Sequence, residues 1–416
     1  MRKKLLSMLL ATTMVVGVLT GCGSSTTSAP AETKTEDAAP AEEAASADGS
    51  VQVGIVLPTK DEPRWLQDQA QFEKILGDAG FTNQVLFSQG SSATEKTNVE
   101  TLVSQGIDVL IICAQDGAAA AAAAETAKAE GVTVIAYDRL ITGTDAVDYY
   151  VTFDSFAVGA AQGQFLIDNA PAGSGIPLYL YAGAATDNNA FIFFQGAWSV
   201  LQPKIADGTF KIVNSDEAVA LQDKADLTRE ELSTIIGQIT TDWDFNVAKS
   251  KAEANLTANG ADAKGDVCVL APNDGTSRAI ADVFSTDKDV TSYVISGQDA
   301  EKASIQYIID GKQSMTVFKD TRTLAADSVA MAVSVLNGET PATDTTYNNE
   351  VKDVPAKQTD VVVVTKDNVK SALIDSGYYV LSVKLDAPAP CRLDAPDLDL
   401  IYYASADCLH QHLQVI

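Results

Sequence analysis

The sequence predicts an α/β protein with two lobes, each built on a parallel sheet whose two faces are covered by helices. Short apolar runs alternate with amphipathic segments from residue 51 onward, and the alternation starts again after 149–154. Such alternation is typical of βαβ units. In addition, GIDVLIICAQDG (106–117) and GDVCVLAPNDG (265–275) share the order Gly, Asp, apolar run, amide residue, Asp-Gly. We interpret this repeat as a duplicated lobe, and chance similarity between two generic βα units is the alternative.

The first lobe is expected to begin with a strand and to alternate strictly. The helical segment RWLQDQAQFEKILGDAG has Leu66, Phe72, Ile75 and Leu76 on one side and Gly80 as its stop signal. Strands are expected at 51–57, 83–89, 107–115, 132–139 and 149–154, and helices at 64–80, 94–106 and 117–131.

The second lobe is expected to repeat this pattern. It has a helix near 155–169, a strand at 176–182, a helix at 187–205, and strands within 265–274 and 291–300. The segment 215–241 is polar, and its periodicity predicts no element.

The N-terminal segment carries the features of an export signal. Arg2, Lys3 and Lys4 precede an apolar run that ends in LTGC, which resembles a bacterial lipobox with Cys22 as the lipidated residue. An ordinary secretory signal that happens to contain a cysteine is the alternative. Residues 23–50 have no aromatic or large aliphatic side chain, so we expect a flexible linker between a membrane anchor and the folded body.

Composition excludes several classes of protein. The chain of 416 residues has 29 basic and 56 acidic residues and a formal net charge of -27, which disfavours nucleic acid and anionic membrane surfaces as partners. Both histidines, His410 and His412, lie near the C-terminus, so a histidine-dependent triad or zinc site is excluded in the body. We expect no metal and no cofactor.

Polar residues follow the predicted strands where each strand ends. Asp138 and Arg139 follow one apolar run, and Asn273 and Gln298-Asp299 follow two runs of the second lobe. Ligands of open α/β sheets bind beyond the carboxyl ends of the strands. A surface ion pair is the alternative for Asp138 and Arg139. A carboxylate and a guanidinium side by side can accept from and donate to hydroxyl groups.

Several motifs occur together and in order: LPTKDEPRW, VIAYDRLI, TFDSFAVGAAQ, DNNAFIFFQGAWSVLQP, APNDG, ISGQDAE and TVFKDTRTLA. From about Val51 to Tyr379 the chain resembles the periplasmic sugar-binding proteins of ABC transporters, in the multiple-monosaccharide and xylose-binding branch. The resemblance implies a type I periplasmic binding fold: two Rossmann-like lobes, joined by a three-stranded hinge, that close on one monosaccharide.

The resemblance also implies a set of sugar-binding residues. They are Arg64, Trp65, Asp138, Arg139, Asn188, Asn189, Trp243, Asn273, Asp299 and Lys319. The sequence does not decide which of Asn188 and Asn189 reaches the sugar, and a place in the helix core is the alternative for Trp65. Further residues that could contact the sugar are Lys60, Asp116, Asp274 and Gln298. Helix capping is the alternative for Asp116, Asp274 and Asp299.

We expect the N-terminal lobe to comprise 51–153 and 301–353, and the C-terminal lobe 154–300 and 354–380. Residues 381–416 depart from the family pattern, and we expect a disordered tail. The predicted function is that of a monomeric extracytoplasmic lipoprotein that delivers a xylose- or glucose-type aldose to an ABC permease and is not an enzyme. The alternatives are a sugar sensor for a chemoreceptor or sensor kinase and a glycosidase using Asp138 and Asp299.

Overall fold

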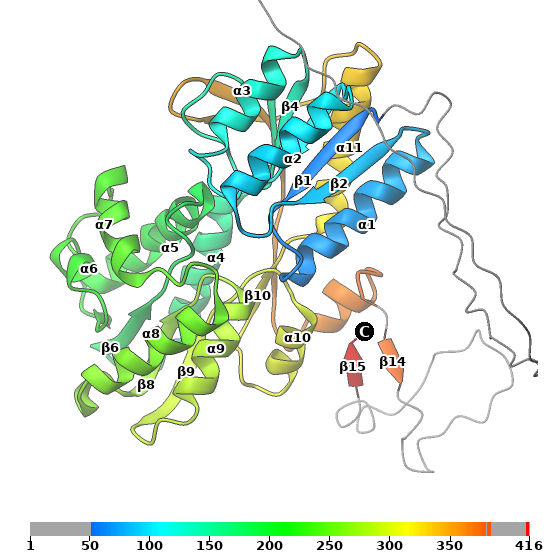
Figure 1. The fold of residues 1–416 in the computed structure, drawn as a ribbon. Helices are drawn as coiled ribbons and strands as arrows, with labels where there is room; N and C mark the ends of the chain where they lie inside the picture. Colours follow the sequence, from blue (N-terminus) through cyan, green and yellow to red (C-terminus); the bar gives the residue numbers. More distant parts are fainter. Residues whose placement is uncertain (1–50, 380, 384–412, 416) are drawn as a thin grey trace, which may run out of the picture. The chain divides into compact units, whose positions relative to one another are not determined.

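The computed structural model describes residues 51–379, 381–383 and 413–415. The predicted signal segment with Cys22, the linker and most of the predicted tail lie outside these residues. Strands and helices alternate along the described chain (Figure 1). None of the helices in these ranges combines the length and the apolar character that crossing a bilayer requires.

The first lobe contains a seven-stranded sheet with the order β11-β12-β5-β4-β3-β1-β2. Its strands are β1 (Val53–Leu57), β2 (Asn83–Phe87), β3 (Val109–Ile112), β4 (Thr133–Tyr137), β5 (Tyr149–Phe153), β11 (Thr345–Asn348) and β12 (Asp353–Thr359). Neighbouring strands are parallel except for the antiparallel pair of β11 and β12.

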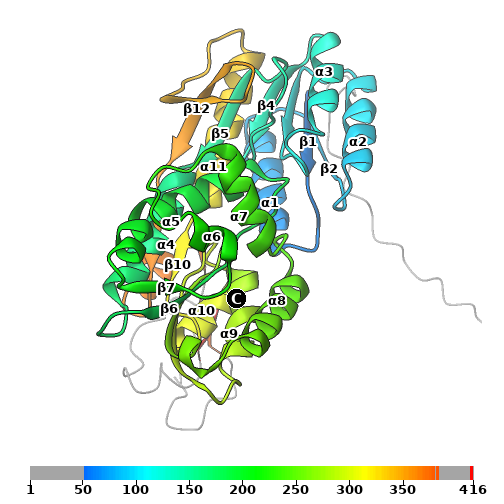
Figure 2. The same ribbon diagram turned by 90° about the vertical axis from the view of Figure 1, so that its left-hand side faces the viewer.

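Helices cover both faces of this sheet, which explains why its central strands β1 and β3 are buried at every position. The helices are α1 (Pro63–Asp78), α2 (Ser92–Ser104), α3 (Ala121–Ala129) and α11 (Thr321–Leu336). Ile55 of β1 packs in the cluster that contains Phe72 of α1 and Leu324 of α11. The next residue, Val56, packs in the cluster that contains Leu102 of α2. Figure 2 shows the two pairs of helices on either side of the strands.

The second lobe contains a four-stranded parallel sheet with the order β7-β6-β8-β9. Its strands are β6 (Ile176–Leu180), β7 (Phe210–Ile212), β8 (Gly265–Leu270) and β9 (Val290–Ile295). On one face lie α4 (Ser155–Asp168), α5 (Asn188–Ala206) and α7 (Arg229–Ile239), and on the other lie α8 (Phe245–Ala258) and α9 (Asp274–Phe284).

The segment for which the sequence predicted no element contains two helices, α6 (Asp216–Ala220) and α7. The start of α7 has a capping box, in which Thr228 and Glu231 satisfy each other's backbone N–H groups. The apolar side of α7 is short, with Leu232, Ile235 and Ile236 buried against the second lobe, and its polar flanks conceal that pattern in the sequence.

The chain passes between the lobes three times: after β5, after β10 (Thr316–Phe318) and after β12. The strands β10 and β13 (Val362–Val364) pair antiparallel beside these crossings. This is the type I periplasmic binding fold that the resemblance implies, with two parallel-sheet lobes and a three-stranded hinge.

The lobe boundaries differ from the expected ones at two places. We expected 301–320 in the first lobe, but Ile305 and Ile308 of α10 (Lys302–Ile309) pack with Ala300 and Leu373, next to the second sheet. We expected 354–359 in the second lobe, but β12 pairs with β5 of the first sheet. Both segments lie next to a crossing, where the hydrophobic pattern continues while the packing partner changes.

The predicted tail contains one feature that we did not expect. The short strands β14 (Leu381–Val383) and β15 (Leu413–Val415) pair antiparallel. The rest of the tail, with His410, His412 and two cysteines, lies outside the described residues.

Candidate functional site

Polar side chains from both lobes meet at the carboxyl ends of the strands. We call the space that they enclose the inner pocket. It is lined by Glu62, Arg64, Trp65, Asp138, Arg139, Asp187, Asn189, Phe193, Trp243, Asn273, Gln298, Asp299 and Lys319. It opens into a larger outer cleft, of about 990 Å³, whose further lining includes Gln67, Gln115, Arg278, Glu301, Lys302 and Tyr379.

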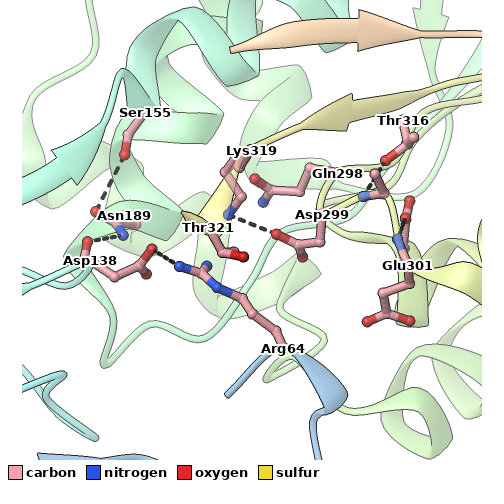
Figure 3. Close-up of polar contacts among 12 residues, drawn as sticks. Arg64, Asp138, Ser155, Asn189, Gln298, Asp299, Glu301, Thr316, Lys319 and Thr321 are labelled. Atoms are coloured by element: carbon pink, nitrogen blue, oxygen red, sulfur yellow. Dashed lines mark hydrogen bonds and ion pairs between the residues drawn. The ribbon is translucent and has the colours of Figure 1, made fainter. Parts of the chain in front are cut away.

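Arg64 and Asp138 form an ion pair in the first lobe, with Arg64 Nη2 and Asp138 Oδ2 2.5 Å apart (Figure 3). Arg64 lies in the first turn of α1, after a proline whose fixed φ suits a helix start. Asp138 directly follows β4. Burial by itself raises the pKa of Asp138, but the positive charges of Arg64, Lys319 and Arg139 together hold it below its ordinary value.

Asp68 lies one helical turn behind Arg64 and is completely buried. Its Oδ2 atom is 3.5 Å from Arg64 Nε. Burial raises the pKa of Asp68 to about 7, although the positive charge of Arg64 opposes the shift. Asp68 therefore sits behind the inner pocket as a carboxyl group that can change its charge near neutral pH.

Arg139 and Asp187 form a second buried ion pair, with Arg139 Nε and Asp187 Oδ2 3.1 Å apart. Arg139 Nη1 also donates to the Ala114 carbonyl at the end of β3. Asp187 caps α5 by accepting from the backbone N–H of Asn189. Because Arg139 follows a strand of the first lobe and Asp187 begins a helix of the second, this pair spans the two lobes.

Asn189 makes a further contact between the lobes. Its Nδ2 atom donates to the backbone carbonyl of Asp138 at 2.7 Å, and Ser155 Oγ donates to its Oδ1 atom at 3.4 Å (Figure 3). The Asp138 carbonyl also accepts from the Tyr150 hydroxyl. These bonds hold the strand end that carries Asp138 and Arg139.

Lys319 and Asp299 form the third ion pair, with Lys319 Nζ and Asp299 Oδ1 2.7 Å apart (Figure 3). Lys319 follows β10 at one of the crossings, and its ammonium lies 5.6 Å from the ring centres of Phe153 and Phe193. The backbone N–H of Asp299 donates to the carbonyl of Val317 on β10.

Two tryptophans lie beside these charges. Trp65 is buried, and the guanidinium of Arg64 lies 4.5 Å from the centre of its ring. Trp243 packs edge-on against Phe193 at 6.2 Å. The indole N–H groups of both tryptophans, and the Gln298 side-chain carbonyl, have no hydrogen-bond partner among the protein atoms. Buried polar groups are normally paired, so these atoms mark places where a bound molecule can form hydrogen bonds.

The structure brings most of the predicted residues together in the inner pocket. Those that line it are Arg64, Trp65, Asp138, Arg139, Asn189, Trp243, Asn273, Gln298, Asp299 and Lys319. Asn273 also caps α9 by accepting from the backbone N–H of Thr276. Of the two neighbouring asparagines, Asn189 lines the pocket, whereas Asn188 accepts from Arg229 Nη1 at 3.0 Å and does not.

Three of the other predicted residues line neither cavity. Lys60 is exposed, with its ammonium 4.9 Å from the ring centre of Phe87. Asp116 caps the turn that leads to α3, since its Oδ1 accepts from the N–H groups of Ala118 and Ala119. Asp274 is fully buried and lies behind the pocket. It accepts hydrogen bonds from Glu301 N–H and Gln313 Nε2.

The sequence reasoning missed three residues that line the inner pocket: Glu62, Asp187 and Phe193. The motifs that contain Arg64 and Asn189 include all three. Asp187 stands where an N-cap is expected before a helix, and that signal could have singled it out. Phe193 lies inside a run of apolar helix residues and has no distinguishing signal.

The arrangement supplies hydrogen-bond donors, acceptors and aromatic faces, and the cations around Asp138 hold its pKa below the range that a general acid requires. Within the described residues, no group of His, Cys, Asp and Glu side chains is placed to hold a metal ion.

Known proteins have sequences related to this chain. The "Multiple sugar-binding periplasmic protein SbpA" of Azospirillum brasilense is 37% identical over 338 residues, which cover 79% of this chain and 89% of that protein. The "D-xylose-binding periplasmic protein" of Escherichia coli (strain K12) is 32% identical over 329 residues, covering 79% and 91%.

A solved structure is more similar still. The carbohydrate transporter solute binding protein from Chloroflexus aurantiacus, in complex with D-glucose, is 68% identical and superposes with a TM-score of 0.78, covering 79% of this chain and 96% of that chain. A family model described as "Periplasmic binding protein domain" matches residues 53–340. The two-lobed fold, the polar site between the lobes and these similarities together make this chain a member of the periplasmic binding protein family.

Proposed function

We propose that this protein captures one neutral aldopyranose, of the glucose or xylose type, in the inner pocket. The observation that carries the proposal is the set of three ion pairs, Arg64–Asp138, Arg139–Asp187 and Lys319–Asp299, at the strand ends of both lobes. Each pair offers donors and acceptors side by side, as a ring of hydroxyl groups requires. The glucose complex of the 68% identical Chloroflexus aurantiacus protein supports this ligand class.

The site residues would share the work of recognition. Asp138 and Asp299 accept from sugar hydroxyls, and Arg64, Arg139, Lys319 and Asn273 donate to them. Trp65 and Trp243 offer apolar faces against which the C–H face of a pyranose packs. The inner pocket has a volume of only about 30 Å³. Because this space is smaller than a monosaccharide, the side chains around it must move when the sugar enters. Arg64 and Lys319 then exchange part of their ion pairing for contacts with sugar hydroxyls as the lobes close.

Charge pairing argues for a neutral ligand. Arg64, Arg139 and Lys319 each already have a buried or half-buried carboxylate within hydrogen-bonding distance, and Glu62 adds a further acidic group to the pocket. A carboxylate or phosphate on the ligand would meet these acids without a free cation to receive it.

The role that fits this site is transport. We propose that the protein works outside the cytoplasm and delivers its sugar to an ABC importer, as a monomer and without catalysing a reaction. The names of the relatives, which are periplasmic sugar-binding proteins, support this role over that of a sensor for a chemoreceptor or sensor kinase. The lowered pKa of Asp138 argues against Asp138 as the general acid of a glycosidase, because that group must hold a proton near neutral pH.

Isothermal titration of the purified protein tests the ligand. We expect binding of at least one of D-glucose, D-xylose, D-galactose, L-arabinose and D-fructose, with a stoichiometry of one, and no binding of D-glucuronate at tenfold higher concentration. Failure of all the neutral sugars would overturn the proposal. Tight binding of glucuronate would overturn the assignment of a neutral ligand. Release of nitrophenol from nitrophenyl glycosides would instead support the alternative function as a glycosidase.

The proposed membrane anchor has its own test. We expect the wild-type chain, expressed in a bacterium that lipidates exported proteins, to sediment with membranes and to incorporate labelled fatty acid. Cys22→Ser should appear in the soluble extracytoplasmic fraction without label. Equal sedimentation of both proteins would contradict lipidation at Cys22.

A further inference from the structure

Gly183 lies at the point where the indole ring of Trp243 reaches the cleft. A methyl group built on Gly183 would lie 2.0 Å from Cζ2 and 2.1 Å from Cη2 of Trp243. These atoms belong to a rigid ring, so they cannot yield as the end of a flexible side chain can. The ring therefore occupies the space that a side chain at position 183 would fill.

The loop that carries Trp243 has an unusual backbone. Asp242 and Trp243 are consecutive residues with φ angles of 53° and 59°. A non-glycine residue in this backbone region is strained and persists only where the surrounding structure determines it. The loop is thus held in one conformation against its own local preference.

The contacts that hold the loop converge on the end of β6, next to Gly183. Thr240 Oγ1 donates to the Gly183 carbonyl at 2.8 Å. Thr241 donates to the Ala182 carbonyl twice, from its backbone N–H at 2.8 Å and from Oγ1 at 2.9 Å. The backbone beside Gly183 therefore anchors the loop, and the missing side chain of Gly183 admits its indole.

The indole also packs edge-on against Phe193 of α5, with 6.2 Å between the ring centres. Trp243 thus packs against both Gly183 and Phe193, and it lines both the inner pocket and the outer cleft. Its N–H group has no hydrogen-bond partner among the protein atoms.

We propose that Gly183 is a positioning residue for the ligand: it sets the depth at which Trp243 enters the inner pocket and thereby the affinity for the sugar. This inference rests on the proposed function, which supplies the ligand. A methyl group at position 183 displaces the indole toward the pocket or out of it, and either displacement removes its packing against the pyranose.

A double-mutant cycle separates this role from a general effect on the fold. D-glucose is the probe, and its affinity is measured by isothermal titration for wild type, Gly183→Ala, Trp243→Ala and the double variant. We expect Gly183→Ala to weaken binding at least tenfold in the wild-type background and less than twofold in the Trp243→Ala background. An equal loss in both backgrounds, or no loss in the first, would overturn the proposal.

A matched control is Gly237→Ala in α7, where a methyl group meets no atom within 4 Å. It should bind D-glucose like wild type, so a loss there would mean that the assay responds to any glycine replacement. If Gly183→Ala does not fold, the melting temperature of the double variant Gly183→Ala/Trp243→Ala tests whether the indole is the cause. Removal of the indole makes room for the methyl group, so the double variant should fold and melt at a higher temperature than Gly183→Ala. Rescue supports the proposal and absence of rescue contradicts it.

Acrylamide quenching of the unliganded protein keeps the inference apart from the proposed function. The chain has three tryptophans, so the signal of Trp243 is the difference between each protein and its Trp243→Phe counterpart. We expect quenching of Trp243 to increase at least twofold in Gly183→Ala, and unchanged quenching would overturn the positioning role. Absence of D-glucose binding by wild type would instead count against the proposed function for this sugar, and the quenching result would stand by itself.

Discussion

Asp138 and Asp299 occupy corresponding places in the two lobes, and both have left-handed backbone angles, with φ of 62° and 97°. Asp138 follows β4 directly, and Asp299 stands four residues after the end of β9. Each carboxylate is paired with one cation, Arg64 or Lys319. Aspartate tolerates this backbone region better than most residues because its short polar side chain bonds locally. Each of the duplicated lobes thus presents one aspartate to the inner pocket from a left-handed backbone conformation.

Replacement of these acids by asparagine tests their part in binding. Asparagine keeps the size and tolerates the same φ, so Asp138→Asn and Asp299→Asn change mainly the charge. We expect each to weaken D-glucose binding at least tenfold, about 1.4 kcal/mol, since a charged acceptor and a cation partner are lost. Asp116→Asn, which keeps its cap outside the pocket, is the control in the same titration and should bind like wild type. Unchanged affinity of both pocket variants would contradict their role.

The buried pair of Arg139 and Asp187 predicts a stability effect. Arg139→Met leaves the Asp187 carboxylate buried without its partner, and breaking a buried pair in this way costs about 3–5 kcal/mol. Adding Asp187→Asn removes the unpaired charge while an amide oxygen can still cap α5. We therefore expect the double variant to be more stable than Arg139→Met alone, by at least about 1 kcal/mol in urea denaturation. Equal stability of Arg139→Met and the double variant would show that Arg139 and Asp187 are not energetically coupled.

Asp68 predicts a pH dependence of folding. Its pKa is raised from 3.8 to about 7 by burial, so between these values the folded protein holds a proton that the unfolded chain has released. The contribution of Asp68 to stability is therefore present at low pH and is lost as the pH rises through 7. The groups that face it are Arg64, Asp138, Tyr137 and Lys319.

The measurement compares wild type with Asp68→Asn, which cannot ionise. We expect the melting temperature of wild type to fall more between pH 5 and pH 8 than that of Asp68→Asn. Other buried acids, such as Glu95, are present in both proteins and cancel in this difference. Parallel curves would mean that Asp68 keeps one charge state throughout.

Asp274 predicts a contrast between two substitutions. Asp274→Ala removes the acceptor for Glu301 N–H and for Gln313 Nε2, and an unpaired buried donor costs about 1–3 kcal/mol. Asp274→Asn keeps one oxygen, which can still accept from the Glu301 N–H group. We expect the alanine variant to melt at the lower temperature and to bind D-glucose less tightly, because Asp299 lies two residues before Glu301. The reverse order would contradict this role.

Local patterns were sufficient for much of this protein. The alternation of apolar runs and amphipathic segments predicted the strands and helices of the first lobe up to β5 and most of those around the second sheet, because burial on both sheet faces leaves a signal within each segment. The strand-end positions of Asp138, Arg139, Asn273 and Asp299 were predicted for the same reason. The capping alternative for Asp116 agrees with the structure because a cap is a contact between near neighbours in the chain.

Other features depend on segments that are far apart in the sequence. The pairing of β12 with β5, and the packing of α10 beside the second sheet, are decided by contacts across the crossings, which leave no periodic signal. The choice between Asn188 and Asn189 follows from the direction in which α5 begins. Only one of two successive helix residues can face the Asp138 carbonyl.

The sequence by itself determined the two-lobed α/β class, the strand ends where polar residues gather and the resemblance to a sugar-binding family. Each of these depends on patterns among residues that are close together along the chain. Only the tertiary structure decided that Asp187 pairs with Arg139, that Asp68 lies buried behind Arg64, and that Gly183 makes room for Trp243. These relationships join separate segments, and their energies depend on distance and burial in space, which the order of residues does not record.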